Sequence, residues 1–201
     1  MLHDGLLEPG VHDWMHFLGT SRLEWACVLT DIQKAIRKYH NPNFTVSFDC
    51  ASPFLATANG QIYTNNIMED RSKWVYKMQP SVDDKKYCSD TRPFRDGVLQ
   101  DGIFEDFLES PISNKTLMKD VCIYCPGDLN KNKKEGKTSW DSFSYAIQMA
   151  HNVWMHINAV QEANRLYDQD IYPGMLIQEK NNRYVCREII DAIFSTSEKG
   201  V

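Results

Sequence analysis

Cys122 and Cys125 are separated by two residues in the stretch DVCIYC. This spacing lets two thiolates reach one tetrahedral Zn²⁺ at about 2.3 Å each, and a closed structural zinc site needs four ligands. His151 is the third candidate, because the 25 residues between Cys125 and His151 are enough for a helix to bring its imidazole back over the two cysteines. The spacing therefore predicts a structural zinc that closes this loop.

The fourth ligand has two candidates. Asp120 is preferred because it lies two residues before Cys122, on the same side of a strand-like segment, and a carboxylate oxygen is an acceptable zinc ligand. Cys88 is the rival, since its thiolate is the softer donor although it stands 34 residues before Cys122. Both candidates stay open at this point.

A cluster of lysines lies between the two cysteines and His151. The stretch NKNKKEGK contains Lys131, Lys133, Lys134 and Lys137. Such a loop could approach a phosphate backbone, or it could be an ordinary solvated loop. The net charge of -5 argues against a uniformly basic nucleic-acid binder but leaves room for one local basic patch.

Composition predicts a soluble, cytoplasmic protein. The chain has 201 residues, of which 42% are apolar, so it can bury a core. Its six cysteines are scattered and no signal peptide is evident, which indicates reduced thiols. No stretch approaches the roughly 18 consecutive apolar residues of a membrane-spanning helix, and no membrane partner is expected.

The elements that would position these residues begin with a βαβ unit. WMHFLG (14–19) reads as a buried strand and turn, and FTVSFDC (44–50) as a second strand. Between them, 23–39 has no Gly or Pro and should be a helix, with Ser21 and Glu24 as its capping box. The two strands should be parallel neighbours.

In βαβ units the loops at the carboxyl ends of the strands build the site. Gly19 and its neighbours follow the first strand, and Asp49 and Cys50 end the second. Asp49 is therefore a candidate catalytic carboxylate, although an acid at a strand end can also be a plain turn or cap residue.

The remaining elements are less regular. Asn59-Gly60 predicts a type I′ turn that opens a strand over 59–64, with 73–78 as its antiparallel partner or close to it. The stretch 79–110 has no assigned role, and only 102–108 suggests a helical turn. A long helix should start at Asp141 and bury one apolar stripe. The stripe consists of Phe143, Ala146, Ile147, Ala150, Val153, Trp154, Ile157 and Val160.

The segment FDCASPFLATANGQIYT (48–64) resembles the tRNA-guanine transglycosylase family, whose members read Phe-Asp-Cys, then Pro, Asn-Gly and an aromatic-Thr pair. The family's zinc signature, Cys-x-Cys-x-x-Cys, 25 residues and His-Asn, is similar to Cys122, Cys125, His151 and Asn152, with Asp120 where the first cysteine is expected. HFLG (16–19) is similar to the preceding barrel strand.

The resemblance implies an α/β fold, the C-terminal part of a (β/α)8 TIM barrel with an inserted zinc-binding subdomain. The chain would divide into barrel βα units with a β-hairpin (1–78), an insertion (79–110), the zinc-binding subdomain with the long helix (111–170) and a C-terminal helical segment (171–201). The implied activity is that of a glycosyltransferase, specifically a pentosyltransferase that exchanges bases.

In that reaction Asp49 would be the nucleophile. It would attack C1′ of a nucleotide, expel guanine and form a covalent glycosyl-enzyme intermediate that a 7-deazaguanine base resolves. The substrate-binding residues would be Gly19, Cys50, Lys131, Lys133 and Lys134, and the zinc ligands Asp120, Cys122, Cys125 and His151.

Two departures from the family change this expectation. Members that act on tRNA carry Pro-Thr-Arg-x-x-Arg after Phe-Asp-Cys, whereas this chain reads PFLATA over 53–58. The loss of the arginines favours the DNA-modifying paralogues of phages and bacteria and makes tRNA the alternative substrate. If the gene is phage-borne, the protein would act in the cytoplasm of the infected host. The family's first barrel half also has no counterpart before Trp14, which predicts a second chain that completes the barrel, or a homo-oligomer.

Three classes of function therefore remain: a base-exchange enzyme or the nucleophile-bearing half of one, a non-catalytic partner subunit of such an enzyme, and a zinc-stabilised binding module unrelated to catalysis.

Overall fold

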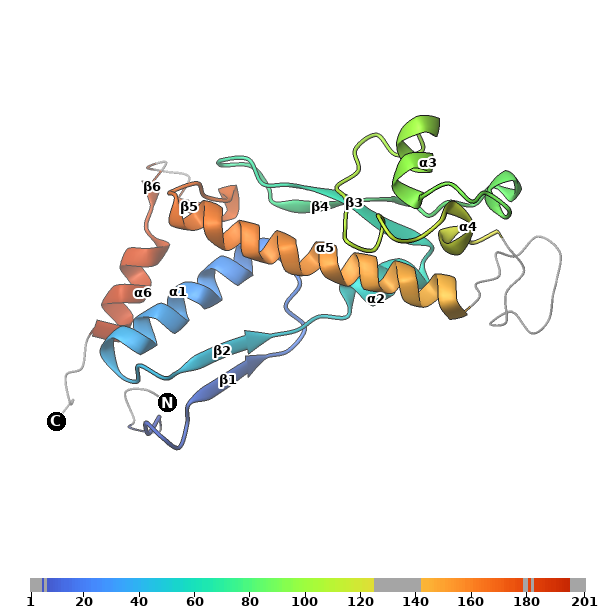
Figure 1. Cartoon of the computed structure of the whole chain (residues 1–201). Coiled ribbons are helices and arrows are strands. Elements are labelled where there is room, and N and C mark those ends of the chain that lie inside the picture. The colour runs from blue at the N-terminus through green and yellow to red at the C-terminus, as the bar shows by residue number, and fades with distance from the viewer. Residues whose placement is uncertain (1–4, 6, 125–141, 179–180, 182, 196–201) are drawn as a thin grey trace. The chain divides into compact units, whose positions relative to one another are not determined.

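The computed structural model describes residue 5 and residues 7–124, 142–178, 181 and 183–195 (Figure 1). The chain forms two compact units. Unit 1 comprises Met1–Cys50, Met68–Val75 and Val160–Val201, and unit 2 comprises Ala51–Ile67 and Tyr76–Ala159. In the described residues the strands form three two-stranded sheets, and none of these sheets closes into a barrel.

Unit 1 contains the expected βαβ unit. Strand β1 (Trp14–Phe17) and strand β2 (Thr45–Phe48) are parallel, with Trp14 opposite Thr45 and Phe17 opposite Phe48. Helix α1 (Leu23–Tyr39) connects them, and the predicted parallel pairing is confirmed. The strands are less buried than predicted, since Trp14 is 64% exposed.

The start of α1 differs from the prediction. The helix begins at Leu23 with Arg22 as its N-cap, and no side chain caps it. The predicted capping box at Ser21 is wrong, because Ser21 lies one residue before the cap and cannot take that position. The apolar side of α1 holds the helix instead, with Leu23, Ala26 and Cys27 completely buried.

The C-terminal part of unit 1 packs on α1. It contains the 3-10 turn η2 (Gly174–Leu176), the antiparallel strands β5 (Ile177–Gln178) and β6 (Arg183–Tyr184), and helix α6 (Cys186–Ser195). Tyr167 donates a hydrogen bond of 2.6 Å to the buried carboxylate of Asp31, and Arg187 lies 3.4 Å from the same oxygen. These contacts tie α1 to the segments that follow the long helix.

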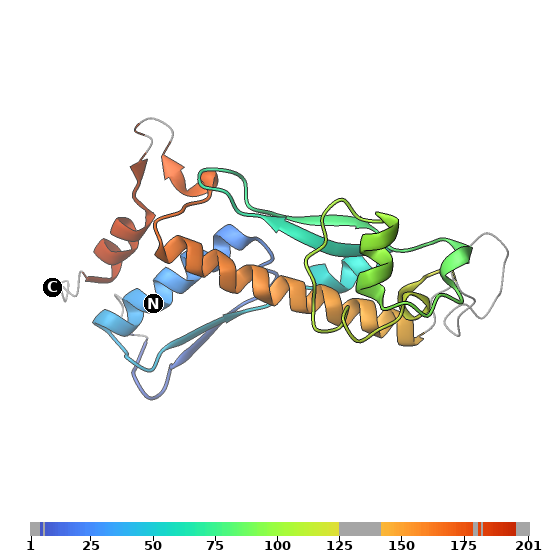
Figure 2. The same cartoon turned by 45° about the horizontal axis from the view of Figure 1, so that its top comes forward.

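Unit 2 is built from six further elements and the first part of the long helix. They are α2 (Ser52–Ala58), β3 (Gln61–Ile67), β4 (Val75–Pro80, from Tyr76 in this unit), the 3-10 turn η1 (Lys85–Tyr87), α3 (Phe94–Asp101), α4 (Met118–Val121) and α5 (Ser142–Asp168). Strands β3 and β4 pair with each other, as expected, and run alongside α5 (Figure 2).

The predicted type I′ turn at Asn59-Gly60 is wrong. Asn59 has φ −89°, whereas this turn needs a positive φ at both central residues. The dipeptide ends α2 instead: the N–H of Asn59 bonds back to Leu55, and Gly60 takes the left-handed conformation at φ +66°. Both structures need a residue that accepts a positive φ, so the sequence signal was ambiguous.

The segment 79–110 supplies a large part of the core of unit 2. Val82, Tyr87, Phe94, Val98 and Phe104 pack in one buried cluster with Ile62, Met118, Val121 and Cys122. The predicted helical turn over 102–108 is wrong. The helix lies earlier, at α3, because Pro93 precedes it and Gly102 at φ +59° ends it.

Helix α5 buries a different face from the predicted one. Its buried residues are Ser144, Gln148, His151, Asn152, Met155, His156, Ala159, Ala163 and Tyr167. The predicted apolar stripe lies on the opposite side and is exposed or half-buried, with Phe143 60% and Ile157 51% exposed. The prediction of the helix is confirmed, but the prediction of its buried side is wrong.

The polar face of α5 is buried because it bonds to the backbone of β3. The Asn152 side chain accepts a hydrogen bond from the N–H of Tyr63 at 2.9 Å and donates one to the carbonyl of Gln61 at 3.1 Å. Gln148 donates a second bond to Gln61, at 3.2 Å. Buried backbone groups need partners, and here helix side chains provide them where a further strand would otherwise be required.

Asn152→Ala should lower the free energy of unfolding by about 3 kcal/mol, because it leaves the buried N–H of Tyr63 without its acceptor and removes the bond of 2.9 Å to Thr57. Urea denaturation at pH 7 measures this loss. Asn158→Ala is the control on the same helix. Among the described residues its side chain donates to the carbonyl of Trp154 alone, so the change should cost below about 1 kcal/mol. Equal losses would contradict the assigned role of Asn152.

Candidate functional site

The strongest candidate site lies at the carboxyl ends of β1 and β2. Asp49 directly follows β2, and its N–H bonds to the carbonyl of Phe17 at 3.3 Å. The carbonyl of Asp49 accepts a hydrogen bond from the N–H of Thr20 at 2.8 Å. The backbone hydrogen bonds between the two strands therefore continue past their last residues. The parallel register thus brings the Gly19 loop and Asp49 together, as the sequence predicted.

The carboxylate of Asp49 is oriented by the backbone. Its Oδ1 accepts a hydrogen bond of 3.2 Å from the N–H of Gly19. Gly19 has φ +71°, a conformation that a residue with a side chain rarely adopts. The glycine therefore sets the direction of this N–H, while the Asp49 side chain remains 61% exposed.

His16 reaches the same carboxylate from β1. Its Nε2 lies 3.6 Å from Oδ2 of Asp49, and its Nδ1 lies 2.8 Å from the hydroxyl of Ser47. The indole N–H of Trp14 also donates to that hydroxyl, at 2.8 Å. The hydroxyl has one proton and two lone pairs, so while it accepts from Trp14 it can either donate to Nδ1 or accept a second bond from it. The tautomer of His16 that has its proton on Nε2 accepts at Nδ1 and directs the Nε2 proton towards Asp49.

These contacts form a chain from Trp14 through Ser47 and His16 to Asp49. Strand alternation explains it, because residues two apart on a strand point to the same face. The register places His16 opposite Ser47, and Asp49 is two residues further on. Sequence reasoning missed Trp14, His16 and Ser47, although alternation along the two predicted parallel strands would have placed them on the face of Asp49.

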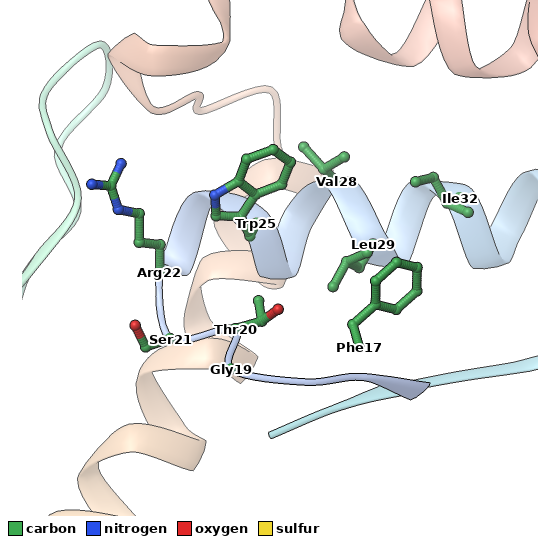
Figure 3. Close-up of a pocket in the computed structure, with 9 residues that line it drawn as sticks. All are labelled: Phe17, Gly19, Thr20, Ser21, Arg22, Trp25, Val28, Leu29 and Ile32. Carbon is green, nitrogen blue, oxygen red and sulfur yellow. The ribbon is translucent and has the colours of Figure 1, made fainter. Parts of the chain in front are cut away.

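A pocket of about 450 Å³ lies on another side of β1, against α1 (Figure 3). Its lining residues are Phe17, Gly19, Thr20, Ser21, Arg22, Trp25, Val28, Leu29 and Ile32. Asp49 is not among them, and Phe17 points to the opposite face of β1 from His16. The lining is mostly apolar, and Trp25 is 48% exposed. The pocket therefore suits apolar side chains better than a nucleobase.

The other predicted substrate-binding residues divide into two groups. Cys50 is half-buried next to Asp49. Lys131, Lys133 and Lys134 lie outside the described residues, as does the zinc candidate Cys125.

The remaining zinc candidates are all engaged in other contacts. The carboxylate of Asp120 accepts from the N–H of Leu117 at 2.9 Å at the start of α4. Cys122 is buried, and its thiol lies 3.5 Å from the carbonyl of Asp84. Cys88 packs against the apolar cluster that contains Cys122. In the described segments no three Cys, His, Asp or Glu side chains gather closely enough to hold a metal ion.

His151 uses both ring nitrogens for hydrogen bonds. Its Nε2 lies 2.9 Å from the carbonyl of Tyr63, and its Nδ1 lies 2.7 Å from the hydroxyl of Ser110. A carbonyl only accepts, so Nε2 carries the proton and Nδ1 accepts from Ser110. Phe107 stacks on the ring at 5.7 Å. In this arrangement neither nitrogen has a lone pair free for zinc, so His151 as placed does not fit the predicted ligand set.

No family model, no curated protein and no solved structure matches this chain. In the part of the chain that the structure describes, no helix has the length and apolar character to cross a membrane.

Stability should fall in mild acid because of His151. Burial lowers the pKa of His151 from 6.5 to about 4, despite the opposing effect of the Tyr63 carbonyl. The folded pKa is below the unfolded value, so the stabilisation is complete above pH 6.5 and is lost as pH falls towards 4. Urea unfolding should show a loss of about 2 kcal/mol from this group between pH 7 and pH 5.

The His151→Gln variant should be less stable than the wild type at pH 7. Between pH 7 and pH 5, however, its free energy of unfolding should fall by about 2 kcal/mol less than that of the wild type. His156 is also buried with a lowered pKa and keeps its own smaller contribution in the variant. An unchanged slope in His151→Gln would show that this ring is not buried in its neutral form.

Proposed function

We propose that this chain belongs to a base-exchange enzyme that replaces guanine in DNA by a 7-deazaguanine base, with Asp49 as the nucleophile. The observation that carries the proposal is the position of the Asp49 carboxylate at the end of β2, between the Gly19 N–H and His16 Nε2. The resemblance of 48–64 to the transglycosylase family supports the same residue from the sequence.

The chemistry is a double displacement. Asp49 attacks C1′ of the nucleotide, and the C1′–N9 bond breaks with its electron pair going to guanine, which takes up a proton as it leaves. The 7-deazaguanine base then attacks C1′, loses a proton and releases the carboxylate. The Gly19 N–H holds Oδ1, which leaves Oδ2 to attack while His16 steadies its charge from 3.6 Å.

The base pocket has to come from outside the described residues. Asp49 is 61% exposed, and its sheet has two strands in the described segments. A nucleobase needs an enclosing pocket with a few directed polar groups, which this open face does not provide. We therefore include in the proposal a second chain, or another copy, that completes the barrel in the cytoplasm around the strand ends.

Lys131, Lys133 and Lys134 are proposed to contact the DNA backbone, where ammonium groups neutralise phosphates. The zinc remains a proposal from the cysteine spacing, and the bonds of His151 and Asp120 argue against those two residues as its ligands. If a zinc binds, it would supply structural closure of the loop that follows Cys122. No step of the reaction is assigned to it.

The exposure of Asp49 also favours a second candidate, a non-catalytic partner subunit in which the same strand ends dock against a catalytic chain. Base exchange in tRNA is the third candidate. It is disfavoured because this chain has PFLATA over 53–58, where the family members that act on tRNA have two arginines.

Asp49→Asn tests the first proposal. With candidate barrel-completing chains supplied, the wild-type chain should release labelled guanine from DNA and form an adduct that survives a denaturing gel. The Asn variant should fold and bind DNA without either, because an amide is a far weaker nucleophile. Asp170→Asn, at a 75% exposed carboxylate of unit 1, is the control and should behave like the wild type.

The outcomes separate the candidates. An adduct that persists in Asp49→Asn removes this residue from the mechanism. Release of labelled guanine from tRNA and not from DNA would favour the third candidate, base exchange in tRNA. If no combination of chains releases guanine although the partner binds, the non-catalytic subunit is favoured.

Metal analysis tests the zinc separately. One zinc per chain is expected, and Cys122→Ser should lose it and lower the melting temperature. His151→Gln should retain the zinc if the hydrogen bonds seen here persist, whereas loss of zinc in this variant would restore His151 as a ligand. Cys88→Ser and Asp120→Ala distinguish the two candidates for the fourth position. Unchanged zinc content in Cys122→Ser would refute the cysteine site.

A further inference from the structure

The hydroxyl of Ser47 is at the centre of the chain of contacts that ends at Asp49. Its oxygen lies 2.8 Å from the indole nitrogen of Trp14 and 2.8 Å from Nδ1 of His16. An indole N–H only donates, so Trp14 takes one of the two lone pairs of the hydroxyl. One lone pair and one proton remain for His16, and on these grounds alone the bond between Ser47 and Nδ1 can run in either direction.

The group on the other side of His16 separates the two directions. Nε2 of His16 lies 3.6 Å from Oδ2 of Asp49, and a carboxylate offers only lone pairs. If Ser47 accepted a bond from Nδ1, the neutral ring would turn the lone pair of Nε2 towards the carboxylate, which is repulsive. If Ser47 donates to Nδ1, the proton is on Nε2 and faces the carboxylate with the attractive sign.

We propose that Ser47 is a positioning residue for Asp49: its hydroxyl donates to Nδ1 of His16 and thereby keeps the His16 proton on Nε2, directed at Oδ2 of the carboxylate. Trp14 supports this arrangement in two ways. Its N–H occupies one lone pair with which Ser47 could accept from the ring. Its indole also lies against the imidazole, with the ring centres 5.6 Å apart, which restricts rotation of His16.

Strand geometry holds this network in place. Residues two apart on a strand share a face, so Trp14 and His16 of β1 lie on one face, and the parallel register places Ser47 of β2 opposite His16. Strands position side chains more precisely than loops do. Phe17 points to the other face, into the pocket against α1, so a molecule bound in that pocket does not reach Ser47.

The network acts on the nucleophile and not on the leaving base. This part of the inference rests on the proposed base exchange. In a displacement the nucleophile and the leaving group occupy opposite sides of the carbon that is attacked. His16 lies beside Asp49, on the side of the nucleophile, and therefore does not protonate the departing guanine. A carboxylate that is no longer directed should form the covalent intermediate more slowly, with DNA binding unchanged.

Long-range ¹H–¹⁵N NMR correlation on the full chain measures the position of the proton, at about pH 8, where an ordinary histidine is neutral. The signals that disappear in His16→Gln belong to His16. The wild type should show a proton on Nε2 and none on Nδ1. In Ser47→Ala the Nδ1 signal should shift, because this nitrogen no longer accepts a hydrogen bond, whereas Ser47→Thr should keep the wild-type position. A proton on Nδ1 in the wild type would overturn the proposal.

The rate of adduct formation on DNA, with the barrel-completing chain supplied, measures the catalytic consequence. Ser47→Ala should lower this rate by about 10-fold, the effect of one lost hydrogen bond, at unchanged DNA affinity. Ser47→Thr keeps the hydroxyl and should react like the wild type. Ser195→Ala removes an exposed hydroxyl of α6 and is the control. Far-UV circular dichroism should show the same fold in all variants.

The outcomes distinguish this role from the base exchange itself. A folded Ser47→Ala that forms the adduct at the wild-type rate would overturn the positioning role. If the wild type forms no adduct with any partner, the base exchange is refuted, and the catalytic role of Ser47 is refuted with it. The NMR measurement needs neither DNA nor a partner, so it decides the direction of the hydrogen bond between Ser47 and His16 in either case.

Discussion

The structure of unit 2 depends on hydrogen bonds between side chains of α5 and the backbone of β3. Asn152 satisfies the N–H of Tyr63 and the carbonyl of Gln61, and His151 satisfies the carbonyl of Tyr63. Buried peptide groups are costly without partners, so this edge of β3 could not be covered by an apolar helix face. The requirement determines how α5 is rotated about its axis, and it holds His151 in a neutral form with both nitrogens occupied.

The candidate site in unit 1 depends on a different constraint, the parallel register of β1 and β2. This register aligns the two strand ends, so the N–H of Gly19 and the ring of His16 meet the carboxylate of Asp49. The contacts orient the carboxylate without enclosing it. An oriented but exposed carboxylate is consistent with a site that a further chain completes, as the proposed function requires.

Both units leave apolar groups on their surfaces. In unit 1 the pocket between β1 and α1 is lined by Trp25, Val28 and Ile32, and Leu18 is 80% exposed. In unit 2, Phe143 and Ile157 of α5 are 60% and 51% exposed. Exposed apolar groups on two separate units are compatible with the further chain that the proposed function includes.

The sequence by itself determined the local elements. Periodicity and helix-ending residues predicted β1, α1, β2 and α5, and strand order placed Asp49 beside the Gly19 loop, because these features depend on neighbours along the chain. Only the tertiary structure decided the rest. Gly60 could end a helix or form a turn, and the apolar stripe of α5 could face in or out. His151 could bind a metal or a backbone carbonyl. Each of these depends on which backbone groups from distant segments need partners, and local sequence does not contain that information.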